Sequence, residues 1–469
     1  MGQPIDRFPR PPYDPEIEPV VRAAAEAAAA DNSDSSFLES LDIAKLRKEA
    51  LERERPRTEA LLRDERVTCR DLTIPGVRDG STLTLTVVRP AAAARGEGAA
   101  TNGAVRNHHN NNIGCNGNSN GNGNCNGKKN YICNGEQKQQ LPPCIFYIHG
   151  GAMVRSNRYA GLDMSVLWAT ELGAVTVSVE YGLAPENAGT GPAEECYAAL
   201  RWATGPEGAA ALAVDPDRIV LYGVSAGGGL AAAVALMARD RAGPPLRGLF
   251  LKAPMLDDRN PRSVAGQQYA TGPMYNSTIN RMAWRCLLGD RAGTAPTASS
   301  TPTTTNGNTH ENQNDKGEVS VYKNGNGTTT TKTVSPYEAP GRATDLAGLP
   351  ATYLDCGTAD PFRDDAAAFA ARLWEGGVAA EFHAWPGCPH AFDRVAPDAA
   401  VSVIAVSTRL AWLRRTLGVP SPPPGGAAVV GTAAGNGVGA ATANGKPLRS
   451  ENGCARVQQG PVVGEQTVE

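Results

Sequence analysis

The stretch RIVLYGVSAGGGLAAAVALMA, residues 218–238, decides the fold of this 469-residue chain. After Arg218, the run to Tyr222 is apolar and β-prone, and the run from Ala226 to Ala238 has the composition of a helix. Between them, Gly-Val-Ser-Ala-Gly matches Gly-x-Ser-x-Gly, a sharp strand-to-helix turn that exposes a serine hydroxyl. A side chain at Gly223 or Gly227 would collide across so tight a turn. We therefore predict that Ser225 is a nucleophile above a sheet, beside the N-terminus of a helix.

The serine needs a base, because an unassisted hydroxyl is a poor nucleophile. Of the six histidines, three lie in Asn-, Gly- or Thr-rich tracts and His149 precedes the serine. His383 belongs to an alternating run, residues 378–385, which is typical of a strand. His390 follows Pro-Gly-Cys-Pro in a loop just past that strand, where an imidazole can reach the serine. We predict His390 as the base, the alternative being a loop histidine without a catalytic part.

The orienting acid is predicted from the run that begins at Tyr353. Asp360 comes just past a Gly-Thr break, at the C-terminal end of a predicted strand, where α/β sheets place their catalytic groups. Asp355 lies inside the apolar run and would point into a sheet. Asp364 and Asp365 open the next helix, where negative charge favours the helix start. We therefore predict Asp360, which gives the order Ser, Asp, His expected of Gly-x-Ser-x-Gly enzymes.

Backbone N–H groups must also stabilise the negative charge that develops on the substrate oxygen. The buried-strand run from Cys144 to Ile148 ends in His-Gly-Gly-Ala, some seventy residues ahead of the serine. Two glycines allow the backbone to turn its N–H groups toward a ligand. We predict Gly150 and Gly151 as oxyanion donors together with Ala226, the residue after the nucleophile. His149 is expected to brace the loop.

These motifs together resemble the hormone-sensitive-lipase-like branch of the α/β-hydrolases, a group of esterases and lipases. The resemblance covers most of residues 65–92 and 142–418. It implies Ser225, Asp360 and His390 as the triad and Gly150, Gly151 and Ala226 as oxyanion donors. The matching segments are His149-Gly150-Gly151-Ala152, Glu180-Tyr181-Gly182-Leu183-Ala184-Pro185-Glu186, Gly223-Val224-Ser225-Ala226-Gly227-Gly228, Asp360-Pro361-Phe362-Arg363-Asp364 and His390-Ala391-Phe392.

The strand and helix signals alternate along most of the chain. This rhythm predicts a mostly parallel sheet with helices on both faces, and the resemblance implies an α/β-hydrolase fold with a helical cap. The expected organisation is an N-terminal helical segment contributing to the cap (1–65), a hydrolase core (66–418) with a disordered insertion (91–141) and a cap insertion (257–340, disordered over 292–334), and a disordered tail (419–469).

Composition excludes several classes of partner. The net charge of −3 gives no reason to expect nucleic-acid binding. No run reaches the eighteen apolar residues of a membrane span, and the N-terminus lacks the apolar core of a signal peptide, so a cytoplasmic location is expected. Cys115, Cys125 and Cys133 follow no zinc-binding spacing, so no metal is predicted.

The sequence thus predicts a serine carboxylester hydrolase that forms an acyl-enzyme on a small to medium acyl ester and needs no cofactor. Two alternatives stay open. One is a non-catalytic small-molecule receptor of the same fold, since the plant gibberellin receptors in this family lose the catalytic histidine. The other is an amidase or deacetylase, which the same triad could serve. The natural substrate and the oligomeric state are not predicted.

Overall fold

The computed structural model describes residues 8–30, 42–91, 131–134, 137–294, 322–323, 329–330 and 333–421. The strands are β1 (Val67–Pro75), β2 (Thr82–Pro90), β3 (Tyr131–Asn134), β4 (Gln137–Gln140), β5 (Cys144–Ile148), β6 (Val175–Glu180), β7 (Ile219–Val224), β8 (Gly248–Lys252), β9 (Tyr322–Lys323), β10 (Thr329–Thr330), β11 (Thr352–Gly357) and β12 (Ala380–Trp385).

The α-helices are α1 (Glu18–Ala30), α2 (Ile43–Arg63), α4 (Met164–Leu172), α5 (Gly191–Thr204), α6 (Pro206–Leu212), α7 (Ala226–Asp240), α8 (Val264–Gln268), α9 (Ser277–Leu288), α10 (Arg363–Glu375), α11 (Phe392–Val395) and α12 (Ala400–Leu417). Short 3₁₀ turns are η3 (Asn260–Arg262), η4 (Gly289–Arg291) and η5 (Pro340–Arg342).

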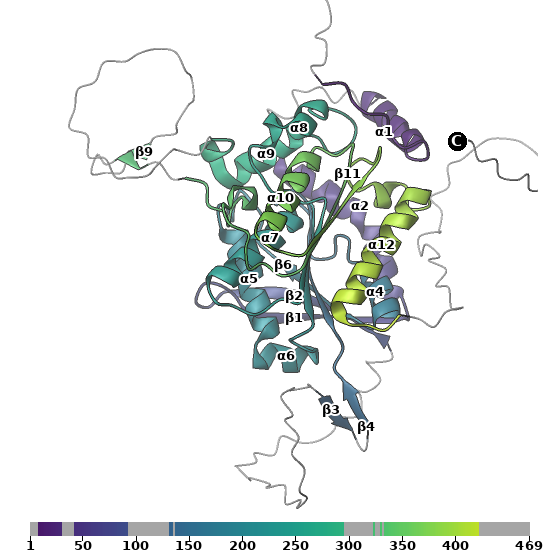
Figure 1. The fold of residues 1–469 in the computed structure, drawn as a ribbon, viewed down its shortest axis with the longest axis vertical. Coiled ribbons are helices and arrows are strands. Elements are labelled where there is room, and N and C mark those ends of the chain that lie inside the picture. Colours follow the sequence, from purple (N-terminus) through teal and green to yellow (C-terminus); the bar gives the residue numbers. More distant parts are fainter. Residues whose placement is uncertain are drawn as a thin grey trace, which may run out of the picture. The chain divides into compact units, whose positions relative to one another are not determined.

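An eight-stranded sheet in the order β1-β2-β6-β5-β7-β8-β11-β12 forms the centre of the fold (Figure 1). β2 pairs antiparallel with both β1 and β6. All the other neighbours are parallel. This confirms the predicted mostly parallel sheet.

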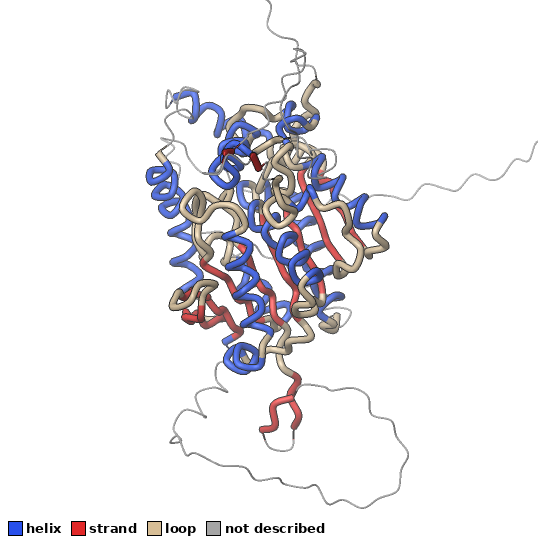
Figure 2. The backbone as a smooth tube through the Cα atoms, turned by 90° about the vertical axis from the view of Figure 1, so that its left-hand side faces the viewer, coloured by secondary structure: helices blue, strands red, loops and turns tan. Residues whose placement is uncertain are grey.

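Apolar side chains on both faces of the central strands explain why helices cover the sheet twice. Along β7, Ile219 and Leu221 belong to the apolar cluster that includes α5, α7 and α10, whereas Val220 and Tyr222 belong to the cluster that includes α4 and α12. Figure 1 shows these two groups of helices on opposite sides of the sheet, and Figure 2 shows helices flanking the strands. A strand buried on both faces reads as a continuous apolar run, which is why β7 was recognisable in the sequence.

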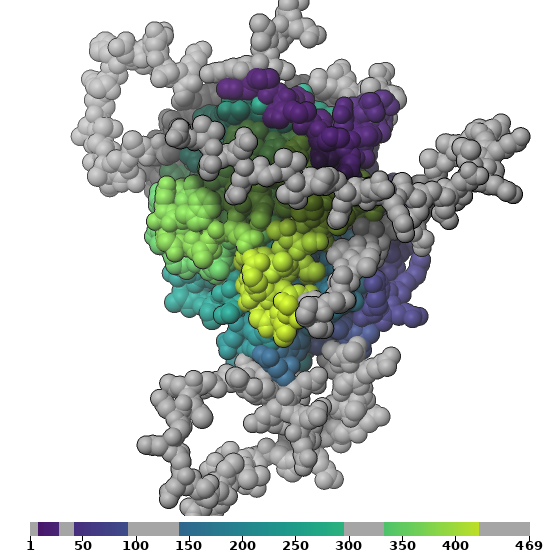
Figure 3. Space-filling model, turned by 45° about the vertical axis from the view of Figure 1, so that its right-hand side comes forward, coloured from purple at the N-terminus to yellow at the C-terminus, as the bar shows by residue number. Residues whose placement is uncertain are grey.

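Residues 8–17, here called the N-terminal strap, run over the C-terminal part of the core. The Pro9 carbonyl accepts a hydrogen bond from Gln268 Nε2 at 2.5 Å, and the Asp14 amide donates to the Gly387 carbonyl at 3.1 Å. Figure 3 shows the purple N-terminal residues above the light-green and yellow C-terminal part. A small apolar cluster joins the strap and α1 to the segment around β12 and α11, and it includes Ile17, Val21, Trp385, Cys388 and Phe392.

Structure also occurs inside the two tracts that were expected to lack it. β3 pairs antiparallel with β4 near the end of the 91–141 tract, and β9 pairs with β10 within 292–334. Val334 is buried, so the core resumes before the expected boundary. The remainder of both tracts, with Cys115 and Cys125, and the tail beyond residue 421 lie outside the described residues.

Candidate active site

Ser225 occupies the sharp turn between β7 and α7. Its backbone has φ 57° and ψ −121°, a conformation that a residue with a side chain adopts only at a cost of about 1–3 kcal/mol. Hydrogen bonds on both sides hold the turn: the Ser225 amide donates to the Lys252 carbonyl at 2.8 Å, and the Ser225 carbonyl accepts from the amides of Gly228 and Met255, both at 2.9 Å. The sheet and the helix therefore impose the conformation that presents the hydroxyl.

Glycine is required on both sides of the serine, for two different steric reasons. A Cβ on Gly223 would run into the backbone carbonyl of Gly227, which is the collision across the turn predicted from the sequence. A Cβ on Gly227 would instead run into the carbonyl oxygen of Ile148, the last residue of β5. The second glycine thus allows α7 to pack against the neighbouring strand.

The structure brings the three predicted side chains together in one hydrogen-bonded chain. His390 Nε2 lies 3.0 Å from Ser225 Oγ, and His390 Nδ1 lies 2.7 Å from Asp360 Oδ2. The other carboxylate oxygen of Asp360 accepts the amide of Phe362 at 2.9 Å. Asp360 is fully buried and Ser225 is 7% exposed. With the serine hydroxyl donating to Nε2, the imidazole carries its proton on Nδ1 and donates it to the carboxylate.

Two loops that contact each other fix the positions of Asp360 and His390. Asp360 follows β11 and His390 follows β12, and the amides of Thr358 and Ala359 donate to the carbonyls of Trp385 (2.8 Å) and Cys388 (3.0 Å). A Cβ on Gly357 would run into the Cys388 backbone, so the loops approach as closely as glycine permits. The parallel pairing of β11 and β12 therefore places both loops at one edge of the sheet.

Two aromatic rings flank the imidazole, and neither contact was predicted from the sequence. The Phe362 ring meets His390 edge-on with centroids 5.3 Å apart, and the Tyr275 ring lies 4.9 Å from it. Tyr275 precedes α9, within the insertion assigned to the cap. No local motif marks it, because its place beside His390 depends on how the insertion folds back over the core.

The His-Gly-Gly-Ala loop adjoins the serine. A Cβ on Gly150 would lie 2.9 Å from the Val224 carbonyl oxygen and 3.2 Å from Ser225 Cβ, so this backbone runs directly beside the hydroxyl-bearing residue. Gly151 has φ +118°, which favours glycine. Among the backbone hydrogen bonds of the described turns and loops, none uses the amides of Gly150, Gly151 or Ala226 as donor.

His149 supports that loop through contacts with Tyr181 and with the Gly150 carbonyl. Its ring is stacked on Tyr181 with centroids 4.2 Å apart, and the Tyr181 hydroxyl donates to the His149 carbonyl at 2.9 Å. His149 Nδ1 lies 2.7 Å from the Gly150 carbonyl oxygen, which can only accept, so Nδ1 carries the proton. Burial lowers the pKa of His149 and favours the neutral ring.

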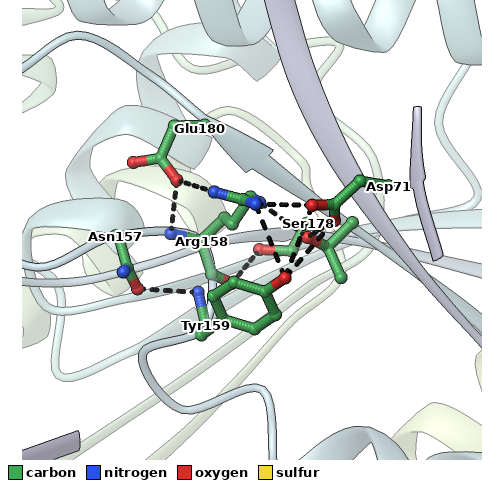
Figure 4. A network of polar contacts seen from close by, with 7 residues as sticks. Asp71, Asn157, Arg158, Tyr159, Ser178 and Glu180 are labelled. Atoms are coloured by element: carbon green, nitrogen blue, oxygen red, sulfur yellow. Dashed lines mark hydrogen bonds and ion pairs between the residues drawn. The ribbon is translucent and has the colours of Figure 1, made fainter. Parts of the chain in front are cut away.

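The loop that continues from the two glycines is tied to the sheet through Arg158 (Figure 4). Its guanidinium lies 2.6 Å from Asp71 Oδ2 on β1 and 2.9 Å from Glu180 Oε2 on β6. Burial lowers the pKa of Arg158, but the two carboxylates outweigh that effect and raise it. The Ser178 hydroxyl also donates to the Arg158 carbonyl at 2.7 Å.

Four buried charges, here called the buried charge cluster, lie behind the histidine loop. Asp393 Oδ2 accepts from Lys252 Nζ and from Arg409 Nη1, both at 2.6 Å, and Arg409 Nε donates to Asp355 Oδ2 at 2.5 Å. Burial raises the pKa of Asp393, but the two cations outweigh it and hold the pKa below its usual range. Asp355 is therefore engaged away from His390, and Asp393 anchors the turn three residues after that histidine.

The two remaining candidate acids also lie elsewhere. Asp364 Oδ2 accepts the Ala265 amide at 2.6 Å and so joins α10 to α8. Asp365 Oδ2 is enclosed and has no hydrogen-bond partner among the described residues. Burial, with a further contribution from Asp257, raises the pKa of Asp365 well above its usual value. Asp360 is the carboxylate that faces His390.

A separate cavity of about 290 Å³ lies in the segment between β8 and β11, and its lining includes none of the residues of the predicted triad. Its lining consists of Asp258, Arg259, Pro261, Arg262, Arg281, Trp284, Arg285, Ala292 and Gly293.

Residues 145–394, a little over half of the chain, match a family model described as alpha/beta hydrolase fold. The chain belongs to this α/β-hydrolase family. It is 31% identical over 283 residues to carboxylesterase NlhH of Mycobacterium tuberculosis, covering 59% of this chain and 74% of the relative. Over 115 residues, 22% of this chain and 10% of the relative, it is 40% identical to human hormone-sensitive lipase.

A solved structure titled bacterial heroin esterase has the same fold, with a TM-score of 0.59 and 28% identity over 86% of this chain and 98% of that one. The resemblance stated from the motifs is therefore confirmed, and this α/β-hydrolase is of the carboxylesterase-like type. Among the described helices, none combines the length and the apolar character needed to cross a bilayer.

Proposed function

We propose that this α/β-hydrolase is a serine carboxylesterase that acts through an acyl-enzyme on small to medium acyl esters. The observation that carries the proposal is the hydrogen-bonded chain from Ser225 Oγ through His390 to Asp360 Oδ2. A receptor that had lost catalysis would not need a base within 3.0 Å of the serine hydroxyl. The cytoplasmic location expected from the sequence stays a prediction.

In the first half-reaction, Ser225 Oγ attacks the ester carbonyl carbon while His390 Nε2 takes the hydroxyl proton. Asp360 holds the Nδ1–H tautomer and stabilises the imidazolium that forms. The amides of Gly150, Gly151 and Ala226 donate to the developing oxyanion. When the tetrahedral intermediate collapses, the C–O bond to the alcohol breaks and His390 returns its proton to that oxygen.

In the second half-reaction, His390 removes a proton from water, which attacks the acyl carbon. The carboxylic acid leaves and Ser225 Oγ regains its proton. This reaction needs no redox step.

The test is labelling by a fluorophosphonate, which reacts with an activated serine. The wild-type protein should be labelled, Ser225→Ala should not, and Ser407→Ala should behave as the wild type, because Ser407 is exposed on α12. Ester hydrolysis by Ser225→Ala should fall by several orders of magnitude. An unlabelled wild-type protein would favour the receptor.

Substrate pairs separate an esterase from an amidase. 4-Nitrophenyl acetate and 4-nitroacetanilide present the same acetyl group to the serine as an ester and as an amide. Efficient cleavage of the ester alone supports a carboxylesterase. Comparable kcat/KM values for the two would show that the protein is an amidase or deacetylase.

A further inference from the structure

Two arginines in the loop after the glycines differ in what they contact. Arg158 forms ion pairs with Asp71 and Glu180 (Figure 4). Arg155, three residues earlier, is partly buried, yet its side chain forms no hydrogen bond or ion pair with any described residue. Its guanidinium nitrogens are also absent from the enclosed, unpartnered polar atoms of the described chain, so they remain accessible.

The backbone places Arg155 at the edge of the site. The Gly151 carbonyl accepts hydrogen bonds from the amides of Val154 (3.2 Å) and Arg155 (3.1 Å). The turn that carries Arg155 therefore follows directly on the His-Gly-Gly-Ala loop. Helix α2 lies over this turn, because Arg47 Nε donates to the Val154 carbonyl at 2.8 Å. Arg155 therefore lies between the loop that adjoins Ser225 and a helix of the N-terminal segment.

The charged and polar neighbours of Arg155 also place it at the edge of the site. Burial has the largest effect on the pKa of the Arg155 guanidinium, and the next largest effects come from the Tyr275 phenol and then from Arg53 and Glu49 of α2. The Tyr275 ring is the one that lies 4.9 Å from the His390 imidazole. Arg155 is thus a near neighbour of the tyrosine whose ring flanks the proposed base.

A comparison within the chain shows what is unusual. Burial lowers the pKa of Arg155, Arg218 and Arg372. Arg218 and Arg372 donate to backbone carbonyls, among them those of Leu417 and Ala343, whereas the five N–H donors of Arg155 have no acceptor among the described residues. The guanidinium of Arg155 is thus partly withdrawn from water, and its N–H donors are free to bind a ligand rather than a described part of the chain.

We propose that Arg155 selects esters that carry a free carboxylate, binding it through the planar fork of the guanidinium. The esterified carboxyl is neutral, so the substrate class is a monoester of a dicarboxylic acid or an ester formed by the hydroxyl of a hydroxy acid. Arginine suits this role because its two parallel N–H groups match a carboxylate. Arg53 adds positive charge nearby, and Glu49 offsets part of it. The inference rests on the proposed esterase function.

The experiment compares matched esters. Mono-4-nitrophenyl adipate and 4-nitrophenyl hexanoate differ by a carboxylate on the acyl side. 4-Acetoxybenzoate and its methyl ester differ by one on the alcohol side. For each pair, the ratio of kcat/KM for the charged ester to that for the neutral ester is measured in the wild type, Arg155→Gln, Arg155→Lys and the control Arg285→Gln, an exposed arginine of α9.

In at least one pair, Arg155→Gln should lower this ratio by about 10- to 100-fold, the loss expected for a charge-assisted hydrogen-bonded contact. Arg155→Lys should keep most of the ratio and Arg285→Gln all of it. If Arg155→Gln is poorly folded, salt gives a second reading, because higher ionic strength should raise the wild-type KM for the charged ester only.

Ratios unchanged within about twofold in both pairs, or a KM insensitive to salt, would overturn the proposal and leave Arg155 a structural residue. Cleavage of the neutral esters in that case would leave the esterase function standing. If neither kind of ester is cleaved by the wild type, it is the proposed function that fails.

Discussion

Replacing Arg409 with methionine should destabilise the fold by about 3–5 kcal/mol, the cost of leaving buried charges without their partner. Arg409 is 5% exposed and contacts Asp355 (1%) and Asp393 (9%). With Lys252, the buried charge cluster holds two positive and two negative groups, so it is balanced. Methionine fills a similar volume but leaves two buried carboxylates facing a single cation.

The measurement is the free energy of unfolding from urea titrations at pH 7, followed by tryptophan fluorescence. Arg415→Met is the matched control, since Arg415 lies six residues later on α12 and its ion pair with Glu381 is exposed. Exposed pairs contribute about 0–1 kcal/mol, so the control should unfold almost as the wild type does. A loss in Arg409→Met no larger than in Arg415→Met would refute the reasoning, because it would mean that the cluster is hydrated or rearranges at little cost.

Four further predictions follow from the site and its surroundings. Asp360→Asn should lower kcat for ester hydrolysis by about 10⁴-fold through the wrong imidazole tautomer, whereas Asp364→Asn should not; equal losses in the two variants would argue against Asp360 as the acid. Gly223→Ala should abolish activity and lower the melting temperature, since its methyl group meets backbone that cannot move aside; a fully active variant would contradict that geometry. The depressed pKa of Asp393 gives stability that is present above the ordinary carboxyl pKa of about 3.9 and is lost as pH falls below it, so acid unfolding curves should be less steep in Asp393→Asn. The raised pKa of Asp365 has the opposite effect on stability, because above pH 4 the unfolded chain ionises this carboxyl more readily than the folded one. Asp365→Asn should therefore stabilise the protein by about 1 kcal/mol at pH 8, and the gain should vanish toward pH 4 in the same unfolding assay.

The sequence was sufficient for the elements whose signals are local. The strand and helix around Ser225 follow from apolar runs and two glycines, and the parallel sheet follows from the alternation of such runs. Asp360 and His390 could be chosen because each comes just past the end of a predicted strand, and the pairing of β11 with β12 brings those ends together. Their catalytic roles stay predictions.

Features that depend on distant side chains were not predictable. The contact between Asp355 and Arg409 joins residues 54 positions apart, and nothing near either one marks the other as its partner. Tyr275 reaches His390 only because an insertion folds back over the core. Arg155 has no partner among the described residues and Arg158 has two, and this difference is equally invisible in the sequence, since both are arginines in the same loop.

The N-terminal strap imposes an order on assembly during synthesis. Its partners at Gln268 and Gly387 are translated more than 250 and 370 residues after it, so residues 8–17 emerge from the ribosome long before anything exists for them to bind. The sheet can form up to β8 before either of these hydrogen-bond partners of the strap has been synthesised. The loop that carries His390 is made more than 370 residues after the strap that contacts it, so this part of the site forms only after the strands through β12 have been made. A chain arrested before β12 would leave Ile17 and Val21 exposed, because the residues that bury them, among them Trp385 and Phe392, would not yet have been made.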